Sequence, residues 1–209
     1  MVTILEISPV RSLFCLLLDS GEKIWLRKAD MQSFPFSAGA EIDEKEFYQF
    51  VTLCQYPRAL NQAVAMLARR ACSTGEIRHK LVSGRYIPDV ADLVLYKLEK
   101  EKLVNDRDFC EQWIRYRMDC RYGPRRILQE LKAKGIPEDM AEEVLASFDP
   151  ESSDNSAAAL ALKSWKRVKP GEDRRKSRQK VIASLVRRGF DWDTARSASD
   201  AAEKQLEIE

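Results

Sequence analysis

One unit recurs along this chain, and the repeat restricts the possible folds more than any other feature of the sequence. Residues 125–148 (RRILQELKAKGIPEDMAEEVLASF) have the pattern of a helix, a glycine break and a second helix. Residues 75–98 (GEIRHKLVSGRYIPDVADLVLYKL) follow the same pattern about one module earlier. Similarity at a fixed period is typical of stacked helical units.

A third copy appears when Leu81, Leu131 and Leu185 are superposed, at intervals of 50 and 54 residues. The other matched positions are then Ile77, Ile127 and Val181; Val90 and Met140; Ala91, Ala141 and Ala195; Val94 and Val144; Gly135 and Gly189; and Ile136 and Phe190. Each unit is expected to hold three short helices, which cannot bury their apolar stripes alone. Stacking such units buries these stripes and builds an elongated, curved surface.

The predicted fold is therefore mainly α, with tandem three-helix repeats behind a small N-terminal β-hairpin and helix. The predicted domains are residues 1–56 for the hairpin and helix extension, 57–104 for repeat 1, 105–150 for repeat 2, and 151–209 for a linker and repeat 3. Within the last boundary, residues 148–156 (FDPESSDNS) are polar and acidic and are expected to act as a hinge.

The first residues favour β structure through their period-two pattern, which predicts an antiparallel hairpin or meander over Val2–Arg27. Residues 33–42 are expected to form a loop. Asp43 is a plausible cap for a helix from Glu44 to about Gln55, and Pro57 is expected to end or interrupt it.

Local signals place the helices of the first repeat. Ser73 and Glu76 have the spacing of a capping box, and Gly84 is expected to take the left-handed turn that ends the helix they begin. The following helix is expected over Asp89–Glu101. Its inward residues are predicted to be Val90, Leu93, Val94 and Leu98.

Charge is distributed unevenly although the net charge is only +2. Residues 115–134 carry seven basic and two acidic residues, and residues 163–180 carry nine and two. Basic stripes on a near-neutral protein favour a polyanionic partner, and the alternative is a solvated helix face.

Five cysteines without a CxxC motif favour reduced thiols, and no apolar run is long enough to span a membrane. The apolar stretch near Phe14 lacks the features of a signal peptide, so a cytoplasmic protein is expected.

Four segments, taken in order, resemble the RecX family of bacterial regulators of the RecA recombinase. They are residues 67–81 (LARRACSTGEIRHKL), 103–114 (LVNDRDFCEQWI), 122–136 (YGPRRILQELKAKGI) and 184–196 (SLVRRGFDWDTAR). The resemblance covers about residues 57–205. Two features depart from it: Arg85 stands where the other repeats have glycine, and residues 166–180 form an expanded basic stretch.

The resemblance implies an array of three-helix repeats that binds RecA and the groove of its filament on single-stranded DNA. It implies inhibition of strand exchange and ATP hydrolysis, and thus a role in homologous recombination, DNA repair and the SOS response. It implies no enzymatic activity and no cofactor. We further expect a monomer with weak direct binding to DNA and no membrane association.

Basic residues around the repeat turns are the candidate contacts with phosphates or with an acidic filament surface. The segment GPRR is the foremost of them, because the free N–H groups of a helix beginning at Pro124 and two arginines would suit an anion. The pairs Arg125–Arg126 and Arg187–Arg188 are expected to dominate. The full candidate set is Arg69, Arg70, Arg78, Lys80, Arg115, Arg117, Arg121, Arg125, Arg126, Lys132, Lys134, Arg174, Arg175, Lys176, Arg187 and Arg188.

Aromatic residues offer a second kind of contact. Trp113 and Tyr116 suit base stacking, although aromatic residues more often belong to the core. Trp192 aligns with the surface-like Glu138 and is a candidate partner contact, while Trp25 is expected to pack in the hairpin.

Three other functions remain as alternatives. The first is a stand-alone DNA-binding protein, since a three-helix unit has the size of a helix-turn-helix module. The second is an enzyme, which the lone His79 and the lack of any catalytic or metal-binding spacing disfavour. The third is a passive helical scaffold.

Overall fold

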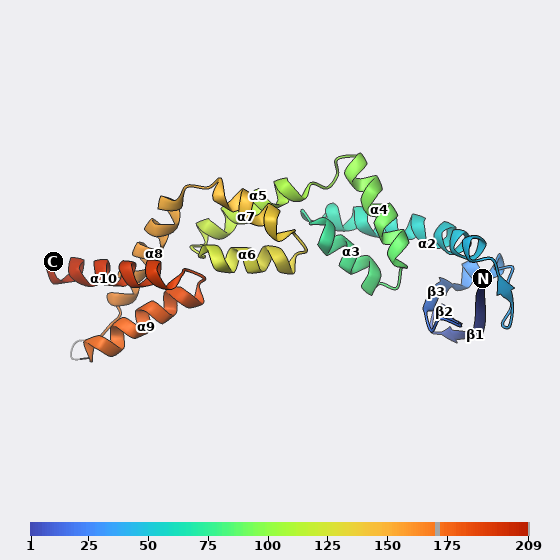
Figure 1. Cartoon of the computed structure of the whole chain (residues 1–209), viewed down its shortest axis with the longest axis horizontal. Coiled ribbons are helices and arrows are strands. Elements are labelled where there is room, and N and C mark those ends of the chain that lie inside the picture. Colours follow the sequence, from blue (N-terminus) through green and yellow to red (C-terminus); the bar gives the residue numbers. More distant parts are fainter. Residues whose placement is uncertain (170–171, 209) are drawn as a thin grey trace. The chain divides into compact units, whose positions relative to one another are not determined.

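The computed structural model describes residues 1–169 and 172–208. The chain forms two compact units, Met1–Asn105 and Asp106–Glu209. The first unit contains a small sheet, one short helix and the three helices of the first repeat, and the described part of the second contains six helices of the other two repeats (Figure 1). No helix in the described part of the chain is both long and apolar enough to cross a membrane.

The predicted N-terminal meander is confirmed. Strands β1 (Val2–Val10), β2 (Leu13–Leu18) and β3 (Lys23–Arg27) pair in antiparallel fashion, with Cys15 opposite Trp25 between β2 and β3. The loop expected over residues 33–42 is wrong at its end, because strand β4 (Glu41–Ile42) pairs with β1 and completes the order β3-β2-β1-β4. A short helix α1 (Lys28–Gln32), which sequence reasoning missed, connects β3 to that loop.

Helix α2 (Glu44–Leu67) does not end at Pro57, so that prediction is wrong. Pro57 has no N–H to donate to the carbonyl of Leu53, and both residues lie on the exposed side of the helix, where water can satisfy that carbonyl. The opposite side stays buried on both sides of the proline, from Phe47 to Ala63. Burial of this continuous face holds the helix together, and the predicted boundary between residues 56 and 57 falls inside it.

Gln55 joins the sheet to the first repeat. Its side chain is buried, with 1% of its surface exposed. Its Nε2 donates to the carbonyl of Trp25 at 3.0 Å, and its Oε1 accepts from the backbone N–H of Ile87 at 2.9 Å. Since both polar atoms of the amide are satisfied, burial costs little and fixes β3, α2 and the start of α4 against one another.

The three-helix repeats are confirmed. Repeat 1 combines the second half of α2 with α3 (Thr74–Ser83) and α4 (Pro88–Lys100). Repeat 2 contains α5 (Asp106–Asp119), α6 (Pro124–Ala133) and α7 (Glu138–Ala146). Repeat 3 contains α8 (Pro150–Trp165), α9 (Arg174–Arg187) and α10 (Trp192–Ile208). Repeats 2 and 3 each have a separate cluster of buried apolar residues, whereas repeat 1 shares one cluster with the N-terminal sheet.

Most matched apolar positions of the repeats are buried as the pattern predicts, although Met140 is only partly buried. Leu81, Leu131 and Leu185 are at most 1% exposed, and the matched alanines of α4, α7 and α10 are at most 2% exposed. The capping box of Ser73 and Glu76 is also present. One prediction of a core-facing residue in α4 is wrong. Leu93 is 46% exposed, and Leu95 is buried instead.

The turn after the second helix of each triplet is the same in all three repeats. The residue in the left-handed conformation is Arg85 (φ 72°), Gly135 (φ 78°) or Gly189 (φ 95°), so the assignment of that conformation to Gly84 is wrong. The N–H of the following residue returns to the carbonyl of Leu81, Leu131 or Leu185, which is the bond that defines a Schellman motif. The motif therefore imposes the turn even where the first repeat has arginine.

The expected hinge at residues 148–156 is wrong, because α8 begins at Pro150. Asp149 caps this helix by accepting a hydrogen bond from the backbone N–H of Glu151 at 3.0 Å. Proline is well suited to the first helical position, so the polar run starts a helix rather than a flexible segment. Of the expanded basic stretch, residues 170 and 171 lie outside the described part of the chain.

Repeats 2 and 3 meet at two glycines. The backbone N–H of Gly123 donates to the carbonyl of Arg188 at 2.9 Å, and that of Arg125 donates to the carbonyl of Gly189 at 3.1 Å. A Cβ on Gly123 would overlap the backbone of Gly189 and Phe190, and a Cβ on Gly189 would overlap Arg126. We name this contact the glycine junction; only residues without side chains let the two backbones approach so closely.

The glycine junction predicts a specific cost for Gly189→Ala. The matched control is Gly21→Ala, because Gly21 also has a positive φ (82°) but has open space where a Cβ would lie. The control is expected to lose about 1 kcal/mol from backbone strain alone. Gly189→Ala is expected to lose about 2 kcal/mol more from overlap with Arg126. Urea unfolding measures both, and equal losses would contradict the junction.

Candidate polyanion interface

The sixteen predicted basic residues divide into two groups in the structure. One group has partners within the chain: Arg70, Arg78, Arg117, Arg126, Lys132, Lys134, Arg174 and Arg188. The other group is exposed and has no ion-pair partner among the described residues: Arg69, Lys80, Arg115, Arg121, Arg125, Arg175, Lys176 and Arg187. Only the second group is available to an external anion without breaking a contact of the fold.

Tyr122 is the centre of the paired group in repeats 2 and 3. The guanidinium carbons of Arg117, Arg126 and Arg188 lie 4.0, 4.4 and 5.4 Å from the centroid of its ring. Cations at such distances are attracted to the aromatic face. We call these residues, together with Glu130, the Tyr122 cluster.

Glu130 supplies the negative charge of the Tyr122 cluster. It forms ion pairs with Arg117 and, at 3.1 Å, with Nε of Arg126. Burial alone would raise the pKa of Glu130, but the hydrogen bonds from the two arginines outweigh it and hold the pKa below its usual range. The carboxylate therefore stays ionised at neutral pH and neutralises part of a locally basic region.

Arg188 crosses the junction and ties repeat 3 to the end of α5. Its Nη1 donates to the carbonyls of Cys120 and Arg121, at 3.3 and 3.4 Å. Arg121 itself adopts a positive φ of 58° in the turn after α5. The side chain thus satisfies carbonyls that the end of a helix leaves open.

The expectation that backbone N–H groups of GPRR are free is wrong, whereas the binding of an anion by its arginines stays a prediction. The N–H of Arg125 is already used by the carbonyl of Gly189, and the N–H of Arg126 donates to the carbonyl of Gly123 at 3.2 Å. The two expected arginine pairs are also divided. Arg126 and Arg188 belong to the Tyr122 cluster, whereas Arg125 and Arg187 are exposed.

Three exposed arginines each adjoin a member of this cluster in the chain, and we call them the outer arginines: Arg121, Arg125 and Arg187. The backbone contacts of the glycine junction and of Arg188 bring the segments that carry them together. Their backbone segments are thereby held by hydrogen bonds of the fold, while their side chains are exposed. Such an arrangement can bind phosphate oxygens or carboxylates at little cost in backbone order.

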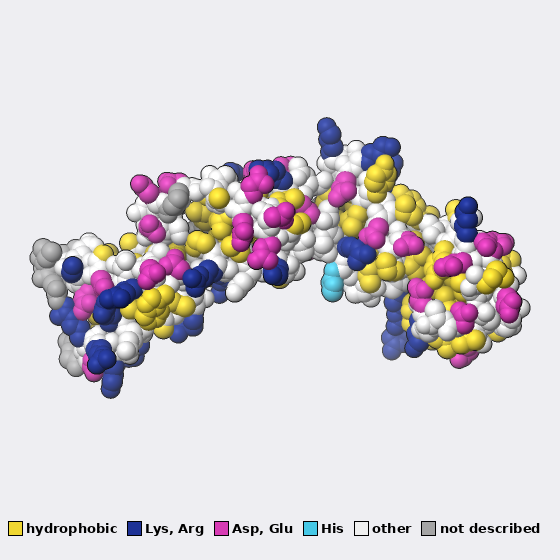
Figure 2. All heavy atoms as spheres, in the orientation of Figure 1, with side chains coloured by type: hydrophobic (Ala, Val, Ile, Leu, Met, Phe, Trp, Pro, Cys, Tyr) yellow, Lys and Arg dark blue, Asp and Glu magenta, His cyan; other side chains and the backbone are white. Residues whose placement is uncertain are grey.

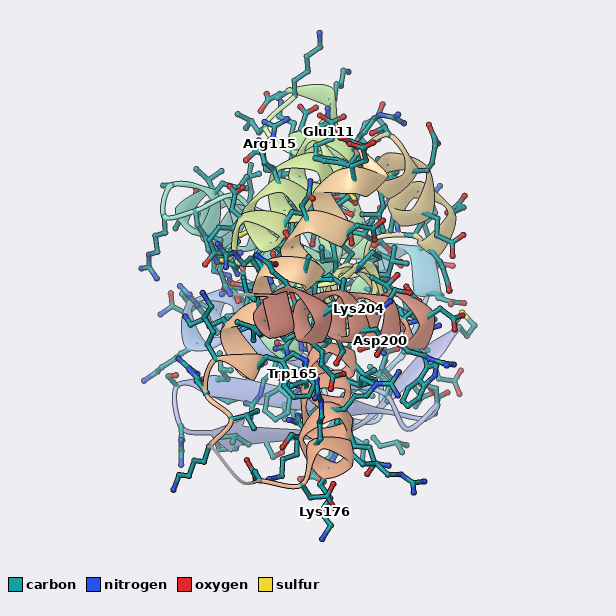
Figure 3. The ribbon with its side chains drawn as sticks, turned by 90° about the vertical axis from the view of Figure 1, so that its left-hand side faces the viewer. Glu111, Arg115, Trp165, Lys176, Asp200 and Lys204 are labelled. Atoms are coloured by element: carbon teal, nitrogen blue, oxygen red, sulfur yellow. The ribbon has the colours of Figure 1, made fainter. Side chains whose placement is uncertain are left out.

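A second basic surface covers the third repeat. Figure 2 shows Lys and Arg side chains gathered over α9, and Figure 3 shows Lys176 directed away from the ribbon at the start of that helix. Two basic residues of α9 already have acidic partners within repeat 3. Arg174 pairs with Glu203, and Nε of Arg178 donates to Asp200 at 2.6 Å. Arg175 and Lys176 remain exposed at this end.

The aromatic predictions have mixed outcomes. The ring of Trp113 stacks on Phe109 at a centroid distance of 6.2 Å. Nζ of Lys134 lies 4.1 Å from the centroid of the Trp113 ring, so the Trp113 side chain is used within the fold. Tyr116 and Trp192 are 55% and 57% exposed and remain available to a partner. Trp165 is buried in repeat 3, where its Nε1 donates to the carbonyl of Ser199 at 3.1 Å (Figure 3). Trp25 carries the guanidinium of Arg85 at 3.8 Å.

Sequence reasoning missed Tyr122 and Glu130. The spacing of Arg126 and Glu130 at i and i+4 is a recognisable helical ion-pair signal. The convergence of three arginines on one ring depends on contacts between residues far apart in the chain, and short-range patterns do not contain it.

His79 is exposed, and within the described residues no group of three or more His, Cys, Asp or Glu side chains could hold a metal ion. None of the five cysteines forms a disulfide in the described part of the chain, and burial raises the pKa of the Cys110 thiol to about 11.

Comparison with known proteins gives consistent matches. Family models match the second three-helix domain of RecX at residues 105–145 and the third at residues 153–198. A regulatory protein RecX of Prosthecochloris aestuarii is 35% identical over 144 residues, which is 68% of this chain and 92% of the relative. This chain belongs to the RecX family. The sequence resemblance is thereby confirmed.

Other members of the RecX family match more of the chain. A regulatory protein RecX of Streptococcus sanguinis is 28% identical over 207 residues, covering 99% of this chain and 78% of the relative. A crystal structure of regulatory protein RecX matches with a TM-score of 0.64 and 25% identity, covering 96% of this chain and all of the other. A crystal structure of RecX from Lactobacillus salivarius matches with the same TM-score and identity over 74% of this chain and 98% of the other.

The division of the arginines predicts opposite results for two neighbouring substitutions. Arg126→Ala removes an ion pair and a ring contact, and it is expected to lower the free energy of unfolding by about 1–2 kcal/mol. Arg125→Ala leaves the fold within about 0.5 kcal/mol, because its side chain is exposed. Urea unfolding of the two variants checks this, and a larger loss for Arg125→Ala would refute the division.

The lowered pKa of Glu130 predicts that the stability of the fold depends on pH. A carboxyl group whose pKa is lowered by folding contributes stability above its unfolded pKa, near 4.5, and loses it as the pH falls through the folded pKa. The difference in unfolding free energy between the native chain and Glu130→Gln is therefore expected to be largest at neutral pH and to shrink below pH 4.5. Urea unfolding at several pH values measures it; a difference independent of pH would contradict the assigned role of Glu130.

Proposed function

We propose that this chain is a non-enzymatic regulatory protein that binds RecA and its filament on single-stranded DNA and inhibits strand exchange and ATP hydrolysis. The observation that carries the proposal is the set of outer arginines, whose backbone segments are held by the glycine junction and the Arg188 side chain and whose own side chains are exposed. Membership of a family whose relatives are named regulatory protein RecX supports it.

The outer arginines act on the polyanionic filament. Each guanidinium group can pair with phosphate oxygens in two parallel hydrogen bonds. Because their backbone segments are already ordered by the fold, binding orders few additional groups and loses little entropy. The arginines compete there with a second DNA strand, which presents the same kind of charge.

The Tyr122 cluster serves this function indirectly. Contacts with Glu130, the Tyr122 ring and backbone carbonyls occupy the guanidinium groups of Arg117, Arg126 and Arg188. The role of these arginines is therefore to stabilise the junction. The chain is proposed to act as a monomer in the cytoplasm, with the exposed end of α9 as a supplementary contact. Direct binding to naked DNA is proposed to be weak in comparison with binding to the filament.

The outer arginines provide a matched test of the proposal. The triple variant Arg121→Ala, Arg125→Ala and Arg187→Ala loses three positive charges from the junction. The control Lys23→Ala, Lys28→Ala and Lys45→Ala loses three from exposed positions of the first unit. Binding to RecA filaments on labelled single-stranded DNA is measured by fluorescence anisotropy, and inhibition of strand exchange in parallel.

The junction variant is expected to bind the filament at least about tenfold more weakly than the control, because exposed arginine–phosphate contacts contribute about 0.5–1 kcal/mol each. Equal loss in the two variants would reduce the effect to net charge and overturn the site. Binding to naked DNA as tight as to filaments, with no effect on strand exchange, would favour the stand-alone DNA-binding function.

A further inference from the structure

A concave site lies beside the glycine junction, within the second unit. It encloses about 480 Å³ and is formed by repeat 2 together with the starts of α8 and α10. Its floor is apolar, and the residues that form it are Met118, Tyr122, Pro124, Ile127, Leu128, Leu145, Ala146 and Phe148. The volume accommodates one large apolar side chain with its neighbours.

The rim of this site is acidic. Glu142 of α7, Asp149 and Asp154 at α8, and Asp191 before α10 all line it, and no Lys or Arg is among the described lining residues. Asp149 and Asp191 also cap helices, accepting from the backbone N–H groups of Glu151 and Thr194. Glu142 and Asp154 are exposed and have no ion-pair partner in the described part of the chain. In Figure 2, apolar side chains lie between α7 and the start of α8, with acidic side chains over both helices.

The charge of this rim restricts what can occupy the site. Four carboxylates that line one pocket repel phosphates, since charges closer than the Debye length of about 8 Å at physiological salt are only partly screened. The apolar floor gains nothing from a hydrated nucleic-acid backbone, but it gains on burial of an aliphatic or aromatic side chain. An occupant with an apolar side chain and flanking positive charge satisfies both parts.

We infer that this pocket docks a protein segment of the RecA filament in which an apolar side chain is flanked by Lys or Arg. The inference rests on the proposed function for the identity of the partner. The apolar side chain fills the floor between α6 and α7, and the flanking cations pair with Glu142 and Asp154. These two carboxylates are the ones that no capping bond occupies.

Tyr122 and Pro124 connect this pocket to the basic surface. Tyr122 lines the pocket and also carries the guanidinium groups of Arg117 and Arg126. Pro124 lines the pocket and precedes Arg125 at the start of α6. One rigid element thus presents an acidic apolar pocket and the outer arginines together, so the same repeat can contact protein through the pocket and nucleic acid through the arginines.

Charge reversal tests the docking site in the full-length chain. The pocket variant is Glu142→Lys with Asp154→Lys. The control is Asp119→Lys with Asp139→Lys, which reverses two exposed charges of repeat 2 that do not line the pocket. Both variants gain the same net charge, so any general increase in affinity for DNA is common to them. Circular dichroism and thermal unfolding verify that both are folded.

Filament binding of the pocket variant is expected to be at least about tenfold weaker than that of the control, because two cation–carboxylate contacts become repulsive. Binding to single-stranded DNA without RecA is expected to be the same for both variants. A pocket variant that binds the filament as tightly as the control overturns the inference and leaves the proposed function intact. A native chain that binds no filament overturns both.

Photo-crosslinking identifies the class of molecule that meets the pocket. A benzophenone amino acid is placed at Ala146, an exposed residue of the pocket, in the native background and in the pocket variant. With assembled filaments, the expected product joins this chain to RecA and is lost in the pocket variant. A product that joins it to DNA, or one that persists in the pocket variant, refutes the docking site.

Discussion

The close approach of two backbones at Gly123 and Gly189 is the contact on which the second unit depends. Gly189 is at once the left-handed residue that ends α9 and the surface against which the first turn of α6 packs. A turn that every repeat uses to end a helix therefore becomes, in the third repeat, a docking element for the second. The N–H groups of Gly123 and Arg125 donate hydrogen bonds across this contact, so the junction combines close backbone packing with satisfied polar groups.

This junction assigns different tasks to arginines that look equivalent in sequence. Arg125 and Arg126 are adjacent, yet one faces solvent and the other pairs with Glu130 and contacts Tyr122. Arg187 is likewise exposed, whereas Arg188 contacts Tyr122 and donates to backbone carbonyls. Some arginines of a basic segment thus stabilise the fold, and the others are exposed. The number of basic residues in a segment is therefore larger than the number available to a partner.

Much of the fold follows from the sequence because helical periodicity and caps are local signals. The buried Leu81, Leu131 and Leu185 and the capping box at Ser73 were predictable for this reason. The continuity of α2 through Pro57 was not, because burial along the whole helix outweighs a local breaker. Likewise the turn at Arg85 follows the backbone motif of the other repeats rather than the preference of its own residue. At the candidate site, the basic composition was readable, whereas the Tyr122 cluster and the acidic pocket arise only when distant segments meet.

The central claim is that this chain regulates RecA filaments through binding along the filament rather than through competition for free DNA. Single-strand-dependent ATP hydrolysis by RecA of the same organism, with the native chain titrated in at two salt concentrations, tests it most directly. The account predicts inhibition well below one chain per RecA subunit at both concentrations. No inhibition, or inhibition only where the chain saturates the DNA and disappears at the higher salt, would contradict it.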